Sequence, residues 1–198
     1  MSTPSQELLT PQFSRISDVV EASAIKQRRL FISKSVDMDL AEEVIKRLWY
    51  LECASATERV ILIINSPGGS VDAGFAIWDQ IKMMPFSITT VVTGLAASMG
   101  SVLALCAPKN RRFATPKSRF LIHQPSLNTV VEGQATDLEI QAREILKTKK
   151  QIVDLYCEAT GKSPEEIEKA IDRDRWMSTE EALAFGLIEK TVSSFKDL

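Results

Sequence analysis

The chain of 198 residues is long enough to form one domain with a substantial core, and its 44% hydrophobic and 25% charged residues are globular values. With 24 basic and 26 acidic residues, the formal net charge of −2 excludes a general attraction to nucleic acid or to an anionic membrane surface. No apolar run approaches the ~20 residues of a membrane span, and the first residues lack the uninterrupted apolar core of a signal peptide.

The first half of the chain alternates between strand and helix patterns. Residues 1–25 are polar and mixed, and they predict a mobile arm ending in a short amphipathic segment, Ile16 to Ile25. Residues 26–198 are expected to form the folded domain. Apolar periodicity predicts a strand at 29–36, a helix at 39–55, a strand at 59–65, a helix at 71–83 and a strand at 87–93. This order is typical of an α/β protein with a largely parallel sheet.

The chain changes character around Ser98. Residues 94–100 are almost wholly Gly, Ala and Ser, and the apolar residues that follow have the spacing of a buried helix starting at Ser98. A serine at such a junction lies beside free backbone N–H groups and the positive end of the helix dipole. A nucleophilic serine needs this environment. The alternative is that Ser98 merely caps the helix.

The only histidine follows soon after. Two strands are predicted at 111–115 and 118–124, and His123 lies at the end of the second. A long helix is predicted from about 134 to 160, where Gly161 ends it, and at 1.5 Å per residue it would span about 40 Å. A projecting helix of this length is typical of one that packs against another subunit.

The C-terminal part contains two well-marked short helices. Capping boxes at Ser163 and Ser178 open them. Between the helices, residues 172–176 (DRDRW) predict a charged loop, and residues 187–192 predict a final strand.

A glycine pair follows the second predicted strand. Residues 65–70 (NSPGGS) lie between a buried strand and a helix, so they are expected at the carboxyl edge of the sheet, where α/β proteins gather their sites. Gly68 and Gly69 can turn a backbone N–H outward because they carry no Cβ. The alternative is a tight turn without chemistry. The segment is not a P-loop, since no lysine is followed by Ser or Thr.

The three cysteines do not suggest a disulfide framework or a metal site. Cys53, Cys106 and Cys157 are widely spaced and odd in number, and each lies in an apolar helical pattern. We therefore predict reduced, buried thiols and a cytoplasmic or organelle-matrix protein.

Taken together, these features are typical of an enzyme that catalyses acyl transfer. A serine at a helix start, a strand-end histidine, a carboxylate in a charged loop and a Gly-Gly turn are the four parts of such a site. They also resemble the Clp protease family. The motifs that carry the resemblance occur in the family's order over about residues 28–192: INSPGGSVDAGFAIWD, TGLAASMGS, RFATPKSRFLIHQP, GQATDLEIQAREIL and DRDRWMSTEEALAFGLIE.

The resemblance implies a serine endopeptidase and a role for each matching residue. Ser98 would be the nucleophile, His123 the general base and Asp174 the third member of the triad. The backbone N–H groups of Gly69 and Met99 would form the oxyanion hole. No metal or other cofactor is implied for this chain.

The resemblance implies a different role for the two charged residues that precede Asp174. Asp172 and Arg173 would bridge subunits across the contact between two rings. From the residues alone, both carboxylates of the DRDR loop could be solvated partners of its arginines, so only the resemblance separates Asp174 from Asp172.

The resemblance also implies a fold and an assembly. The fold would be an α/β spiral of ββα units, of the kind that Clp proteases and crotonases share, with the helix at 134–160 as a projecting handle. Two stacked seven-membered rings would enclose a chamber, and an AAA+ unfoldase of the ClpX, ClpA or ClpC type would feed in unfolded polypeptides and consume the ATP. The arm at 1–25 and the stretch 126–133 depart from the family pattern, which raises the alternative of rings that include a paralogous subunit.

Two other functions compete with a protease. One is a crotonase-like acyl-CoA enzyme, which uses paired backbone N–H groups but needs no Ser-His pair. The other is a non-catalytic scaffold subunit of a mixed ring. A fluorophosphonate probe separates them, because it should modify only the protease, and at Ser98.

Overall fold

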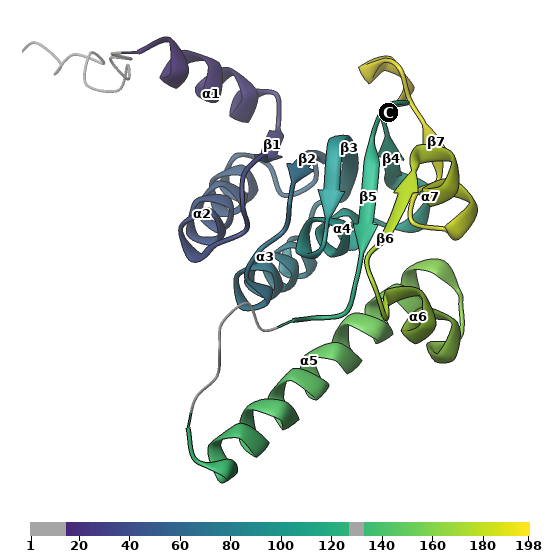
Figure 1. Cartoon of the computed structure of the whole chain (residues 1–198). Helices are drawn as coiled ribbons and strands as arrows, with labels where there is room; N and C mark the ends of the chain where they lie inside the picture. The colour runs from purple at the N-terminus through teal and green to yellow at the C-terminus, as the bar shows by residue number, and fades with distance from the viewer. Residues whose placement is uncertain (1–14, 127–132) are drawn as a thin grey trace, which may run out of the picture.

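The computed structural model describes residues 15–126 and 133–198, which form an α/β fold around one sheet (Figure 1). The strands are β1 (Arg29–Ile32), β2 (Val60–Ser66), β3 (Ile88–Ala97), β4 (Arg112–Ala114), β5 (Arg119–Ile122), β6 (Arg175–Ser178) and β7 (Lys190–Thr191). The helices are α1 (Ile16–Lys26), α2 (Met38–Ala54), α3 (Val71–Met83), α4 (Met99–Leu103), α5 (Ala135–Thr160), α6 (Pro164–Ile171) and α7 (Thr179–Phe185). Short 3-10 turns occur at Ala104–Cys106, Lys109–Arg111 and Phe195–Asp197.

The long strand β3 lies at the centre of the sheet. It pairs with β2 along one edge, and along the other it pairs first with β4 and then, nearer its carboxyl end, with β5. These pairs, together with β1–β2 and β4–β7, are parallel, whereas β5–β6 is antiparallel. The predicted α/β fold with a largely parallel sheet is confirmed.

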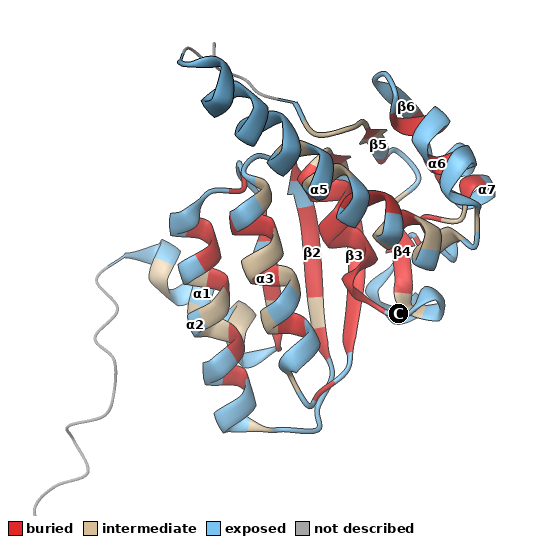
Figure 2. Ribbon diagram, turned by 90° about the horizontal axis from the view of Figure 1, so that it is seen from below, coloured by how far each residue is buried: buried red, intermediate tan, exposed pale blue. Residues whose placement is uncertain are grey.

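Two helices cover one face of the sheet, because each has one apolar side. Figure 2 shows the buried sides of α2 and α3 turned toward β2 and β3. The carboxylate of Asp37 accepts from the Leu40 N–H at the start of α2, and the Ser70 hydroxyl accepts from the Ala73 N–H at the start of α3. The residues that α2 and α3 bury are Leu40, Ala41, Val44, Leu48, Leu51, Ala73, Gly74, Ile77 and Ile81.

Helix α5 projects from the body of the domain (Figure 1). Its 26 residues span about 39 Å, as predicted, and Gly161 ends it in the left-handed conformation with φ of 75°. The predicted apolar face is buried only near the C-terminal end, at Ile152 and Tyr156, whereas Leu138 is 41% exposed. Within the described residues, no helix is both long and apolar enough to cross a membrane.

The structure corrects several local predictions. Strand β3 continues to Ala97, because pairing with β5 stabilises a small-residue stretch that has little strand propensity of its own. Strand β1 ends at Ile32 and not at residue 36. Arg175 and Trp176 lie in β6 and not in a charged loop, since β5 offers them an edge to pair with.

Two more predictions concern the termini and the thiols. Residues 16–25 of the predicted arm lie in α1, none of whose residues is buried, and residues 1–14 lie outside the described part of the chain. The same holds for residues 127–132 of the atypical stretch. Cys106 is buried as predicted, but Cys53 is exposed on α2. All three thiols are free.

Candidate active site

Ser98 stands in a sharp turn between β3 and α4. Its backbone has φ of 52° and ψ of −123°, a conformation that costs a non-glycine residue about 1–3 kcal/mol. The Ser98 N–H donates to the Leu121 carbonyl over 2.9 Å. The side chain makes no capping hydrogen bond to α4, so the interpretation of Ser98 as a helix cap is wrong. A strained turn between a strand and a helix is a setting in which nucleophilic serines occur.

The glycine turn after β2 packs directly against this serine. A Cβ on Gly68 would lie 2.7 Å from Ser98 Cβ and 2.8 Å from the Met99 nitrogen, and Gly68 has φ of 87°. Position 68 therefore requires glycine for both space and backbone conformation. The turn is also tied to the segment after β1, because Val36 N–H donates to the Gly68 carbonyl over 2.8 Å and Ser70 N–H donates to the Val36 carbonyl over 2.7 Å.

The histidine reaches Ser98 through the pairing of β3 with β5. Ala97 pairs with Leu121, so the residues that follow the two strands are neighbours. His123 Nε2 lies 2.7 Å from Ser98 Oγ, which is hydrogen-bond distance. The imidazole is partly covered, with 27% of its side-chain surface exposed.

The carboxylate arrives through the antiparallel pairing of β5 with β6. Ile122 pairs with Arg175, which places Asp174 opposite His123. Asp174 Oδ1 lies 3.4 Å from His123 Nδ1, and the Asp174 side chain is 65% exposed. The Asp172 carboxylate instead lies 3.8 Å from Arg173 Nε. The structure thus brings the Asp174 carboxylate to the histidine, whereas the Asp172 carboxylate lies beside the Arg173 guanidinium.

Gln124, which no sequence pattern marked as functional, joins the two segments that carry His123 and Asp174. Its backbone N–H donates to the Ile171 carbonyl over 2.7 Å, and its side-chain amide donates to the Asp172 carbonyl over 2.9 Å. Gln124 follows His123 directly, but nothing in the local sequence indicates that its partners lie almost 50 residues away.

Two backbone donors lie beside Ser98. Within the described part of the chain, the N–H groups of Gly69 and Met99 donate to no protein acceptor. Met99 is buried, and its nitrogen faces the glycine turn. A developing negative charge on a ligand oxygen could accept from both groups.

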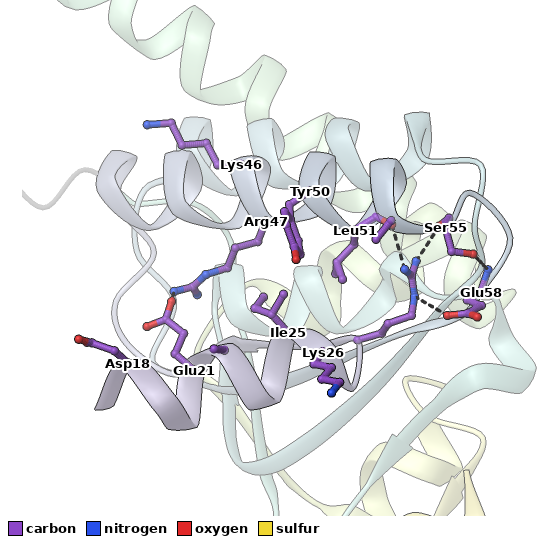
Figure 3. A pocket seen from close by; sticks show the side chains of 13 residues that line it. Asp18, Glu21, Ile25, Lys26, Lys46, Arg47, Tyr50, Leu51, Ser55 and Glu58 are labelled. Atoms are coloured by element: carbon purple, nitrogen blue, oxygen red, sulfur yellow. Dashed lines mark hydrogen bonds and ion pairs between the residues drawn. The ribbon is translucent and has the colours of Figure 1, made fainter. Parts of the chain in front are cut away.

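A large hollow of about 900 Å³ lies elsewhere, between α1 and α2 (Figure 3). Arg28 is one of its lining residues, and the Arg28 guanidinium donates to the carbonyls of Leu51 and Ser55 at the C-terminus of α2. None of its lining residues belongs to the group around Ser98. Over residues 15–126 and 133–198, no three His, Cys, Asp or Glu side chains are grouped so that they could hold a metal ion.

Comparison with known proteins decides the family. A family model described as Clp protease matches residues 12–194. The ATP-dependent Clp protease proteolytic subunit 1 of Chlamydia abortus is 60% identical over 185 residues, which cover 93% of this chain and 96% of that protein. The chain belongs to the Clp protease family. The proteins of the same name from Chlamydia caviae and Protochlamydia amoebophila are 59% and 56% identical, over 94% and 93% of this chain and 98% and 90% of their own lengths.

Membership of the Clp protease family makes the chain a serine peptidase and a proteolytic subunit of the Clp type. It favours this function over the crotonase-like alternative, which shares the spiral architecture but needs no hydrogen-bonded serine and histidine. The family resemblance drawn from the sequence motifs is confirmed over nearly the whole chain.

Proposed function

We propose that this Clp protease subunit cleaves unfolded polypeptides with Ser98 as its nucleophile. The observation that carries the proposal is the 2.7 Å contact between Ser98 Oγ and His123 Nε2. At this distance the imidazole accepts the hydroxyl proton directly, which activates an otherwise weak nucleophile. A non-catalytic scaffold subunit would have no need of this contact.

The proposed reaction proceeds in two halves. Ser98 Oγ forms a bond to the carbonyl carbon of the substrate while His123 Nε2 takes the hydroxyl proton. His123 then gives this proton to the leaving amine as the peptide C–N bond breaks, which leaves an acyl-enzyme on Ser98. Water then attacks the acyl carbon while His123 takes a proton from it. The bond between this carbon and Ser98 Oγ breaks, Ser98 regains the proton from His123, and the acid product leaves. These steps use protein groups and water alone, with no cofactor on this chain.

The N–H groups of Gly69 and Met99 would hold the oxyanion in both halves of the reaction. Support for this assignment comes from the packing of the Gly68 turn against Ser98 and the Met99 nitrogen. Donors that are already oriented stabilise the developing charge without reorganisation, and one such donor is typically worth about 10²–10³ in kcat.

Asp174 would orient the imidazole. A carboxylate at Nδ1 favours the tautomer whose Nε2 is free to accept from Ser98, and it stabilises the imidazolium that forms. The 3.4 Å separation and the β5–β6 register support this role.

The assembly is part of the proposal. The relatives are named as proteolytic subunits of an ATP-dependent protease, which supports an oligomer served by an AAA+ unfoldase of the ClpX, ClpA or ClpC type that consumes the ATP. We place α5 as the handle between two stacked seven-membered rings, because apolar side chains on its projecting part are exposed, Leu138 at 41% and Leu146 at 62%. Asp172 and Arg173, which are also exposed, would bridge the rings.

Two further points of the proposal concern composition and location. The relatives carry the number 1 in their names, which supports rings that include a paralogous subunit. Three free thiols suit the reducing interior of a cell or organelle, so we place the enzyme in the cytoplasm or an organelle matrix.

A fluorophosphonate probe tests the proposed function. We expect the probe to label the chain at Ser98, and Ser98→Ala to abolish labelling and peptide hydrolysis while the oligomer, measured by size-exclusion chromatography with light scattering, persists. Ser193→Ala, which changes an exposed serine near the C-terminus, is the matched control and should leave both unchanged. Labelling of Ser98→Ala, or no labelling of the natural chain in the presence of its unfoldase and paralogue, would overturn the proposal.

A further inference from the structure

A buried chain of hydrogen bonds connects α5 to the backbone of Ser98. The hydroxyl of Tyr156, on α5, lies 2.7 Å from Ser101 Oγ on α4, and the Ser101 hydroxyl donates to the Ser98 carbonyl oxygen over 2.6 Å. Because the Ser101 hydroxyl has one proton and donates it to the Ser98 carbonyl, Tyr156 is the donor in its bond to Ser101. Tyr156 and Ser101 are each 1% exposed, so water does not compete for these groups.

The Ser98 carbonyl, which is the last acceptor in this row of hydrogen bonds, belongs to the same peptide unit as the Met99 N–H. In a planar trans peptide the C=O of Ser98 and the N–H of Met99 point in opposite directions, so whatever holds one group orients the other. The Ser98 carbonyl also accepts from the N–H groups of Ser101 at 2.9 Å and Val102 at 3.3 Å. These donors hold the carbonyl toward α4, which leaves the Met99 N–H on the side of the glycine turn, where a Cβ on Gly68 would lie 2.8 Å from the Met99 nitrogen.

We propose that Tyr156 is a positioning residue for catalysis, which acts through Ser101 to hold the Ser98–Met99 peptide so that the Met99 N–H faces the oxyanion. This inference rests on the function proposed above, because it takes Ser98 as the nucleophile and Met99 as an oxyanion donor.

Two physical effects require the hydroxyl of Tyr156 and not merely its ring. The backbone of Ser98 is strained, with φ of 52°, and such a conformation persists only where its surroundings hold it. Each donor in the chain also polarises the next, so the Ser98 carbonyl, and with it the Met99 N–H, becomes a stronger hydrogen-bonding group. Burial raises the pKa of the Tyr156 hydroxyl above its ordinary value, which keeps the donor proton in place.

Because Tyr156 lies on α5, this row of hydrogen bonds also connects α5 to the site around Ser98. Tyr156 belongs to the buried end of α5, and the exposed part of the same helix projects from the domain. The orientation of the donor therefore depends on how α5 is seated against α4, which couples the handle to the oxyanion site through one side chain.

Tyr156→Phe tests the inference, because it keeps the ring and removes only the hydroxyl. In the assembled protease we expect kcat for a fluorogenic peptide to fall about 3- to 10-fold with KM unchanged, since one hydrogen bond that acts on the transition state is lost. The inhibition constant of a peptide boronate, whose tetrahedral adduct on Ser98 occupies the oxyanion site, should rise by the same factor. The control is Tyr50→Phe, the only other tyrosine, which is 63% exposed on α2 and should behave as the natural chain.

A double-mutant cycle with Ser101→Ala completes the test. We expect the effects of Tyr156→Phe and Ser101→Ala on boronate inhibition to be clearly less than additive, because both interrupt one chain. A lower unfolding temperature of Tyr156→Phe with unchanged kcat and boronate inhibition would show a structural role only and would overturn the inference, while fluorophosphonate labelling of Ser98 in the natural chain would leave the proposed function standing. Failure of that labelling would overturn both.

Discussion

Ser98 and His123 are held by the interior of the parallel sheet, whereas Asp174 is held by its antiparallel edge. Ser98 directly follows Ala97, which pairs with Leu121, and His123 directly follows Ile122, the last residue of β5. The Ser98 and His123 side chains are 2.7 Å apart. Asp174 precedes the four-residue strand β6, lies 3.4 Å from the imidazole and is 65% exposed. Ser98 and His123 are therefore positioned by two neighbouring parallel strands inside the sheet, whereas the position of Asp174 depends on a strand at its edge.

The largest effect should come from the interior pair. We expect His123→Ala to lower kcat/KM for a fluorogenic peptide by about 10⁴-fold or more, because the chain has no other imidazole to take the Ser98 proton. The oligomer should be unchanged by light scattering. Substantial residual activity would show that the reaction does not depend on the contact between Ser98 and His123.

Substitution of Asp174, at the edge of the sheet, should lower activity less than substitution of His123, but by a clearly measurable factor. We expect Asp174→Asn to lower kcat by about 10²–10³-fold, below the ~10⁴ known for a buried triad aspartate, because water partly replaces an exposed carboxylate. The matched control is Asp172→Asn, which should weaken the pairing of rings in sedimentation velocity and leave the kcat of intact rings within about threefold. Equal losses of activity from the two variants in intact rings would contradict the assignment of Asp174.

The glycine turn tests how closely the interior site is packed. We expect Gly68→Ala to lower kcat about 10²-fold and to destabilise the fold by about 1–3 kcal/mol, because the new Cβ would displace Ser98 and the Met99 nitrogen. Gly161→Ala is the control, with a similar φ of 75° but nothing within 4 Å of the new Cβ. It should cost about 1 kcal/mol in thermal unfolding and no activity. An active Gly68→Ala variant would show that the turn can shift away from the site.

The smallest loss of activity should come from substitution of Gln124, which connects the His123 segment to the Asp174 segment. We expect Gln124→Ala to lower kcat about threefold, since it frees the Asp172 carbonyl and loosens the segment that carries Asp174. Because it acts through Asp174, it should have no further effect in an Asp174→Asn background. Gln151→Ala on the exposed side of α5 is the control. Independent, multiplying effects of the two substitutions would mean that Gln124 acts elsewhere in the site.

Features that depend on neighbouring residues could be predicted from the amino-acid sequence. Apolar periodicity located α2, α3 and α5 to within about a residue at either end, and the capping boxes of Ser163 and Ser178 start α6 and α7 where predicted. It also placed Ser98 at a strand-to-helix junction and His123 at a strand end. Caps, turns and periodicity act over a few residues, so a single sequence contains their full signal.

Features that depend on distant partners could not be predicted from local sequence patterns. Strand β3 reaches Ala97 because β5 pairs with it, and Asp174 rather than Asp172 meets His123 because Ile122 pairs with Arg175. The bond from Tyr156 to Ser101 joins residues 55 positions apart. The physical reason is that register between strands and contacts between helices are set by packing over the whole core, so the local pattern around either partner contains no trace of the other.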